Sequence, residues 1–183
     1  MCKFLRIESF PEFEKNEHYF EYLCAVEKTY KKYSKYIFDD FSPLLNCKVE
    51  TFVENFAPYF WLVLNREDKF MGFVYLDNFV GNSERLFSAE VSTCFDRCAW
   101  GIFVRYSAKI FFKMCFDVFG FQKIKAQIYP QNSYVRTFLK DVGFEYESLL
   151  IGETLRCGKL QNIEVYSLYR NYYYKNNEVI YGN

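Results

Sequence analysis

Hydrophobic and polar positions along the chain follow two different periods, and each period predicts a type of element. Between residues 102 and 119 every fourth residue is polar and nearly all the others are apolar. The polar residues are Arg105, Lys109, Lys113 and Asp117. Steps of four advance slightly more than one helical turn, so these side chains form a narrow polar stripe on a helix. We expect this helix to be largely buried against a sheet. Further helices are expected at residues 12–35, 45–56 and 133–142.

Short runs rich in β-branched and aromatic residues alternate with these helices. The runs at residues 60–64 and 70–76 are separated by a polar segment, residues 65–69, which predicts a hairpin. Other strands are expected at residues 3–9, 86–95, 123–129, 145–154 and 163–170. The order is strand, helices, three strands, helix, strand, helix and two strands. This order predicts an α/β or α+β chain with a mixed sheet.

Length, composition and charge favour one folded domain. The chain has 183 residues, 51% of them hydrophobic, which is enough to bury a sizeable core. Lysine plus arginine and aspartate plus glutamate both total 23, so the formal net charge is zero. A nucleic-acid-binding protein usually has a basic excess, so this balance argues against such a partner. We expect a single domain over residues 1–170 and a Tyr- and Asn-rich tail over residues 171–183. The tail either packs back or contacts another chain, such as a second copy.

Cysteine usage and hydropathy predict the compartment. The seven cysteines are scattered and contain no Cys-x-x-Cys pair, which favours a reducing compartment over a disulfide framework. Cys94 and Cys98 lack the histidines of a zinc site, since His18 is the one histidine, so no metal is expected. The first 15 residues contain no signal-peptide core. The longest apolar run, residues 56–64, is too short to span a bilayer. We therefore expect a cytoplasmic protein without a membrane partner.

The most specific pattern of the chain lies at residues 123–145. A predicted strand ends in Tyr129-Pro130-Gln131-Asn132, a short helix follows, and Gly143-Phe144-Glu145 comes directly after it. With the later turn at Gly158, this order resembles the GNAT acyltransferases, in particular the ribosomal-protein N-terminal acetyltransferase branch. The resemblance is strongest from Ala89 to Arg170. It implies a mixed, mostly antiparallel sheet that is splayed between its fourth and fifth strands, with helices on both faces.

The resemblance also implies an activity. It suggests an N-acetyltransferase that moves the acetyl group of acetyl-CoA to a primary amine on a protein N-terminus, a lysine or a small molecule. Glu90, on the predicted strand at residues 86–95, is the implied general base, acting directly or through water. Contacts to acetyl-CoA are implied for the end of that strand, the start of the next helix and an asparagine further along. These residues are Cys94, Phe95, Trp100, Gly101, Ile102, Phe103, Arg105 and Asn132.

Several positions differ from the family pattern. Phe103 stands where a glycine normally lets a phosphate approach the backbone, and Arg105 stands where a small residue is usual. The charge of Arg105 would partly compensate. Val135 replaces a serine that this branch often places near the sulfur, and Leu139 stands at the position of a tyrosine used by other members. These substitutions motivate a competing interpretation, in which a GNAT-like domain has lost catalysis and serves as a binding or assembly module.

Four of these candidates also have a purely structural interpretation. Trp100 and Phe103 could be core residues, and Glu90 could be an ordinary strand carboxylate. Asn132 precedes a predicted helix and would suit its N-cap.

Overall fold

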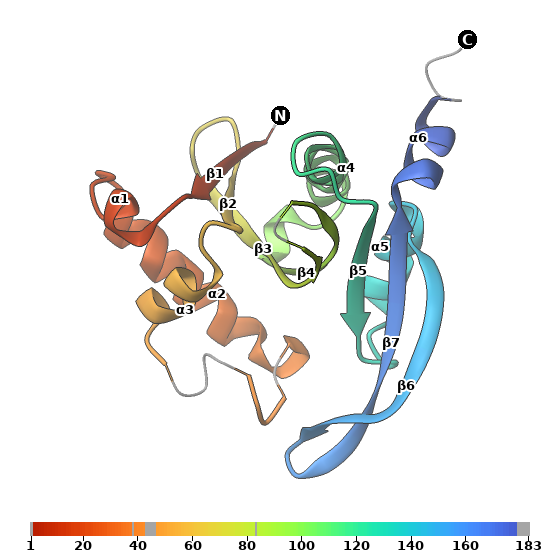
Figure 1. The fold of residues 1–183 in the computed structure, drawn as a ribbon. Helices are drawn as coiled ribbons and strands as arrows, with labels where there is room; N and C mark the ends of the chain where they lie inside the picture. The colour runs from red at the N-terminus through yellow and green to blue at the C-terminus, as the bar shows by residue number, and fades with distance from the viewer. Residues whose placement is uncertain (1, 38, 43–46, 83, 179–183) are drawn as a thin grey trace. The chain divides into compact units, whose positions relative to one another are not determined.

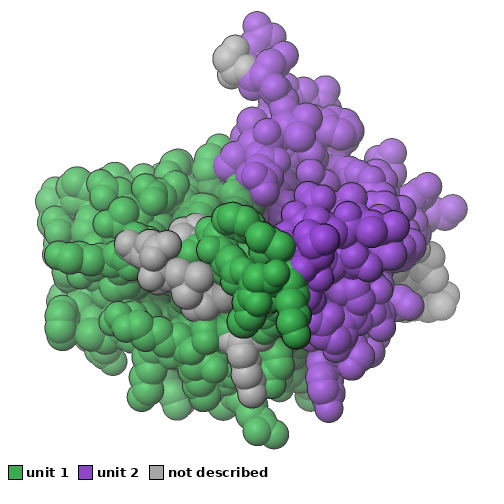
Figure 2. Space-filling model, turned by 90° about the horizontal axis from the view of Figure 1, so that it is seen from below, with its two compact units in different colours: residues 1–77, 92–107, 155–159 green, residues 78–91, 108–154, 160–183 purple. Residues whose placement is uncertain are grey.

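The computed structural model describes residues 2–37, 39–42, 47–82 and 84–178 (Figure 1). The chain divides into two compact units, coloured separately in Figure 2. The first unit contains residues 1–77, 92–107 and 155–159, and the second contains residues 78–91, 108–154 and 160–183. Among the described residues, none of the helices combines the length and the apolar composition that crossing a bilayer requires.

Seven strands form one sheet in the order β1-β2-β3-β4-β5-β7-β6. Their bounds are β1 Lys3–Ile7, β2 Phe60–Leu64, β3 Phe70–Gly81, β4 Leu86–Phe95, β5 Lys123–Ile128, β6 Glu145–Arg156 and β7 Lys159–Tyr169. β2 pairs antiparallel with β1 and β3, and β5 pairs antiparallel with β7. β4 and β5 are parallel, with a register that runs from Ser88↔Lys123 to Glu90↔Lys125. The predicted mixed, mostly antiparallel sheet is therefore confirmed, as is the hairpin between β2 and β3.

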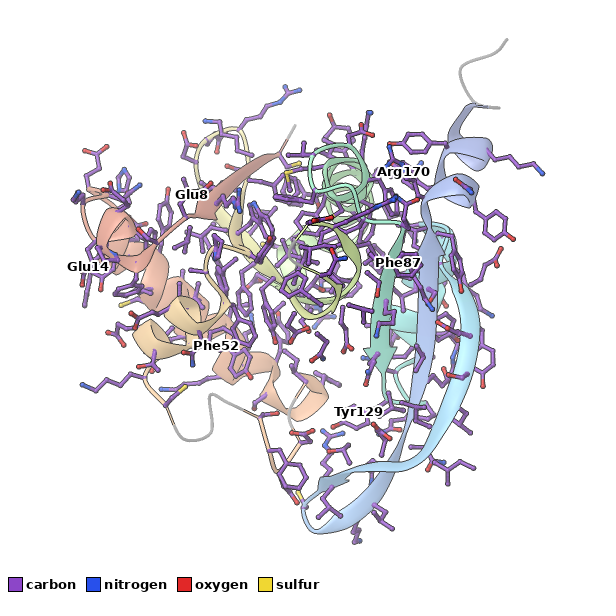
Figure 3. The ribbon with its side chains drawn as sticks, in the orientation of Figure 1. Glu8, Glu14, Phe52, Phe87, Tyr129 and Arg170 are labelled. Atoms are coloured by element: carbon purple, nitrogen blue, oxygen red, sulfur yellow. The ribbon has the colours of Figure 1, made fainter. Side chains whose placement is uncertain are left out.

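Aromatic side chains fill the core of the first unit. This core lies between β2 and β3 and the helices α1 (Phe10–Phe13), α2 (Tyr19–Ile37) and α3 (Val49–Phe56). Phe52 of α3, labelled in Figure 3, is fully buried at the centre of the cluster. Its ring contacts those of Tyr30, Phe60, Phe73 and Tyr75. Part of the chain's aromatic content, which comprises 22 Phe and 17 Tyr residues, is thus used in the packing of this unit.

The helix expected at residues 12–35 is divided in two by a turn. α1 ends at Phe13 and α2 begins at Tyr19. Asn16 explains the break, because its side-chain Oδ1 accepts a hydrogen bond from the backbone N–H of His18 at 2.9 Å. This is the Asx-type turn with which asparagine competes against helical hydrogen bonding. α3 begins later than expected, and residues 45 and 46 of that prediction lie outside the described part of the chain.

The helix α4 (Ile102–Asp117) is less buried than its pattern predicts. The polar residues 105, 109, 113 and 117 are exposed, as expected. Three apolar residues are exposed as well: Ile102 at 87%, Tyr106 at 45% and Ile110 at 36%. They recur every four residues, beside the polar stripe, so the solvent-facing surface of α4 is wider than the stripe itself. The prediction of a largely buried helix with one narrow polar stripe therefore underestimated the solvent-facing width of α4.

The second unit is completed by α5 (Ser133–Asp141) and α6 (Arg170–Glu178). α6 occupies most of the predicted tail and packs back onto α4. The Tyr173 hydroxyl donates to the carbonyl oxygen of Lys109 at 2.8 Å, and the Tyr174 hydroxyl donates to the carboxylate of Asp117. Tyr173 is buried. Of the two alternatives for the tail, the structure therefore supports packing on the chain's own helix through the described part of α6.

Candidate active site

The end of β4, the connection that follows it and the start of α4 carry seven of the predicted site residues, all in the first unit. Gly72 of β3 allows β4 to come close, because a Cβ there would lie 2.6 Å from the carbonyl oxygen of Cys94. The Cys94 side chain is buried, and its thiol donates to the carbonyl oxygen of Thr29 at 3.8 Å. Burial raises the pKa of this thiol to about 12. Cys94 is thus a core thiol, and any contact of Cys94 with a ligand would involve its backbone.

A short connection fixes the direction in which α4 begins. Asp96 caps a 3-10 helix at Arg97–Ala99, where its carboxylate accepts from the backbone N–H of Cys98 at 3.2 Å. The ammonium of Lys32 donates to the same carboxylate at 3.2 Å. The Tyr33 hydroxyl accepts from the N–H of Arg97 at 2.8 Å. Two residues of α2 therefore hold the loop that leads into α4.

Gly101 marks the beginning of α4. Its φ of +105° lies in the region that favours glycine, and its carbonyl accepts from the N–H of Arg105 at 3.2 Å. A Cβ built on Gly101 would meet nothing within 4 Å, so the space beside this residue is open. The first N–H groups of any helix lack intrahelical partners and carry the positive end of its dipole. The first turn of α4 therefore offers a favourable position for an anion.

Hydrophobic side chains flank this first turn. Trp100 is 42% exposed and Ile102 is 87% exposed, so the alternative that Trp100 is a core residue is wrong. Phe103 is half-buried, and Arg105 is exposed. The turn thus combines backbone donors, one guanidinium group and accessible apolar surface within a few residues.

Glu90 lies in the second unit, in the middle of β4, and its side chain is buried. Its Oε2 accepts from the Nδ2 of Asn78 on β3 at 3.3 Å and from the Nε2 of Gln127 on β5 at 2.9 Å. Burial raises the pKa of the Glu90 carboxyl, while the amide of Asn78, the charge of Lys125 and the amide of Gln127 act in the opposite direction. A buried carboxylate with a raised pKa is a suitable proton acceptor near neutral pH.

Asn132 is the N-cap of α5. Its side-chain oxygen accepts from the backbone N–H of Val135 at 3.4 Å, which accounts for an asparagine here without a ligand. Leu139, on the same helix, is buried. Its side chain therefore serves the core, at the position where the resemblance to the GNAT acyltransferases implies a tyrosine in some members.

Sequence reasoning identified Glu90 but missed the two amides that contact it. Gln127 lies inside the pattern at residues 123–145 and Asn78 near the end of β3, and neither was singled out. No local signal distinguished these amides, because β5 also contains Lys123 and Lys125, and Asn78 follows Asp77 in β3. Within the residues that the structure describes, no group of three or more His, Cys, Asp or Glu side chains could hold a metal ion.

Comparisons with known proteins give a consistent result. The family model described as the acetyltransferase (GNAT) domain matches residues 11–145. The search of curated proteins gave no match. Spermidine N-acetyltransferase from Vibrio cholerae, solved with CoA and spermine, superposes with a TM-score of 0.71 at 15% identity, covering 94% of this chain and 97% of that chain.

Two further solved structures share the fold. Ribosomal-protein-S5-alanine acetyltransferase from Vibrio fischeri has a TM-score of 0.65 at 16% identity, covering 93% of each chain. RimJ from Mycobacterium smegmatis, in complex with CoA-disulfide, has a TM-score of 0.65 at 14% identity, covering 82% of this chain and 78% of that chain. At such low identities these similarities show the fold and leave the substrate open.

Proposed function

The chain belongs to the GNAT acetyltransferase family, and we propose that it transfers the acetyl group of acetyl-CoA to a primary amine. The acceptor would be a protein N-terminus, a lysine side chain or a small amine. The observation that carries this proposal is the buried carboxylate of Glu90, held by two amides in the middle of β4. The similarity to structures that contain CoA supports acetyl-CoA as the acyl donor.

Binding of the donor requires a place for its pyrophosphate. The first turn of α4 suits this group, because its N–H groups point out of the helix and the helix dipole favours negative charge. The open space beside Gly101 removes one steric obstacle, and the guanidinium of Arg105 adds a positive charge in the same turn. We propose that the residues from Trp100 to Arg105, with the backbone of Cys94 and Phe95, contact the donor.

The chemical step requires removal of a proton from the acceptor amine, which is charged at neutral pH. In the proposed reaction Glu90 accepts this proton, directly or through one water. The neutral nitrogen then attacks the thioester carbonyl. A C–N bond forms, the C–S bond breaks, and the nitrogen gives up its second proton as it becomes an amide. The CoA thiolate takes up one proton in exchange and leaves as the thiol, and Glu90 returns its proton to solvent before the next turnover. The raised pKa of Glu90 suits this role, because a higher pKa makes the carboxylate a stronger proton acceptor.

Isothermal titration with acetyl-CoA and with CoA tests donor binding. We expect saturable binding of both ligands at concentrations below the millimolar range. Absence of binding at millimolar concentrations would contradict the acetyltransferase proposal. It would instead favour the interpretation that this domain acts as a binding or assembly module.

Glu90→Gln tests the chemical step. The substitution keeps the size and hydrogen-bonding reach of the side chain but removes proton acceptance. We expect kcat to fall by a factor on the order of 10²–10⁴, with acetyl-CoA affinity within a few-fold of wild type and partial rescue at higher pH. Glu153→Gln, on the exposed surface of β6, is the matched control and should retain full turnover. Near-complete activity of Glu90→Gln at neutral pH would refute the assignment of Glu90 as the base.

A further inference from the structure

Three neighbouring strands of the second unit meet at one carboxylate oxygen. Asn78 comes from β3, Glu90 from β4 and Gln127 from β5. Both amides donate to the same atom, Oε2 of Glu90, at 3.3 Å and 2.9 Å. Among the described residues, no hydrogen bond to the other oxygen, Oε1, accompanies them. A carboxylate oxygen has two lone pairs, so two donors are enough to occupy Oε2.

The backbone at both amide positions favours this arrangement. Asn78 has a φ of +46°, in the left-handed region that asparagine tolerates better than most residues. Such a conformation inside a strand costs free energy and is often found where a side chain must be directed to a site. Gln127 lies two residues beyond Lys125, the register partner of Glu90. Residues two apart in a strand share one face of the sheet, so Gln127 is on the face to which Glu90 points.

We propose that Asn78 and Gln127 are positioning residues, which hold Oε2 of Glu90 and leave Oε1 to receive the proton of the acceptor amine, directly or through water. This inference rests on the proposed function, because it assigns partners to the same general base. Neither amide takes up or releases a proton itself. Their contribution is to fix the direction of one lone pair.

The same two amides also influence the charge on Glu90. Burial favours the neutral acid, and three groups oppose it: the Asn78 amide from β3, and the Lys125 ammonium and Gln127 amide from β5. A hydrogen bond to the ionised form of a carboxyl lowers its pKa. Loss of the amides should therefore raise the pKa of Glu90 and increase the protonated, inactive fraction below neutral pH.

The test uses substitutions that preserve the backbone. Asn78→Gly removes the amide while retaining a residue that accepts a positive φ, and Gln127→Met keeps the side-chain length without a donor. In the double variant, a ¹³C NMR titration should show a higher pKa for the Glu90 carboxyl than in wild type. The acid limb of the pH profile of kcat/KM should move in the same direction. At pH values on the acid limb, turnover should fall by roughly tenfold. This fold-change corresponds to the lower end of the range for the loss of a hydrogen bond to a charged group, and we use the lower end because both amides are partly exposed to solvent.

Controls separate this inference from the function on which it rests. Gln122→Ala removes an amide that donates to the carbonyl of Gly120 and should leave both the Glu90 pKa and the profile unchanged. In a Glu90→Gln background the amide substitutions should cause no further loss of turnover.

An unchanged Glu90 pKa in the double variant would overturn the positioning role, whether or not the enzyme is active. Full activity of Glu90→Gln would instead refute the general-base assignment. Failure to bind acetyl-CoA would refute the proposed function itself.

Discussion

Replacement of Phe52 gives the sharpest test of how the aromatic residues stabilise the first unit. The side chain is 0% exposed. Its ring lies 5.2 Å from Tyr30, 5.5 Å from Tyr75, 5.8 Å from Phe60 and 6.1 Å from Phe73, measured between ring centroids. Truncation of a buried Phe to Ala typically costs about 3–5 kcal/mol, from lost burial and from the cavity that remains. Because several rings border this cavity, we expect a loss near the middle of that range, about 4 kcal/mol in the free energy of unfolding.

This loss is large compared with the total stability of most proteins, about 5–15 kcal/mol. Urea denaturation followed by tryptophan fluorescence would measure it, since both tryptophans, Trp61 and Trp100, belong to the first unit. Phe20→Ala is the control: its side chain is 74% exposed, and the expected change is within about 0.5 kcal/mol. A loss below about 1 kcal/mol for Phe52→Ala would refute the packing argument.

Two further predictions concern titratable groups. Burial raises the pKa of Cys94 to about 12 and that of Cys115 well above its ordinary value, so a thiol reagent should modify the buried cysteines only after denaturation. The buried cysteines are Cys2, Cys94 and Cys115, and the exposed cysteines, which should react quickly, are Cys24, Cys98 and Cys157. Rapid labelling of a buried thiol in the native protein would contradict this prediction. The hydrogen bonds of Glu147 with Lys123 and with Ser167 lower the pKa of its carboxyl, so their stabilisation is present at neutral pH and is lost as the pH falls through the folded-state pKa. The difference in unfolding free energy between wild type and Glu147→Gln should therefore shrink as the pH is lowered from about 7 to about 3, and a constant difference would show that the ion pair contributes nothing.

The elements with strong local signals were predicted well from the sequence. β2 and β4 were predicted with the bounds that the structure has, and α4 and α5 differ only at their C-terminal ends. The reason is that continuous apolar runs and the four-residue polar stripe are properties of the chain itself. Burial depends on the neighbours of an element, which a pattern does not contain. The exposure of Ile102, Tyr106 and Ile110 could not be read from the helical period for that reason.

Long-range hydrogen bonds explain another part of what was missed. The strands β6 and β7 extend further than predicted and meet at a turn in which Cys157 and Gly158 have φ values of +50° and +70°. A cysteine is an unusual residue for such a position. The carboxylate of Asp40 accepts from both backbone N–H groups of this turn, at 2.8 Å each. A partner more than a hundred residues away in the chain leaves no local signal.

The candidate site shows the same division between local and long-range information. Glu90 could be singled out as a candidate because the family resemblance gave that position a role. Its interpretation as a base depends on the hydrogen bonds from Asn78 and Gln127. These residues come from the strands on either side of β4, and no sequence motif connects them. A carboxylate on an exposed strand would be held by water and would have an ordinary pKa. The burial of Glu90, offset by two amides and one ammonium, is what distinguishes a candidate base from a surface carboxylate. That distinction arises only when three strands of the sheet are assembled.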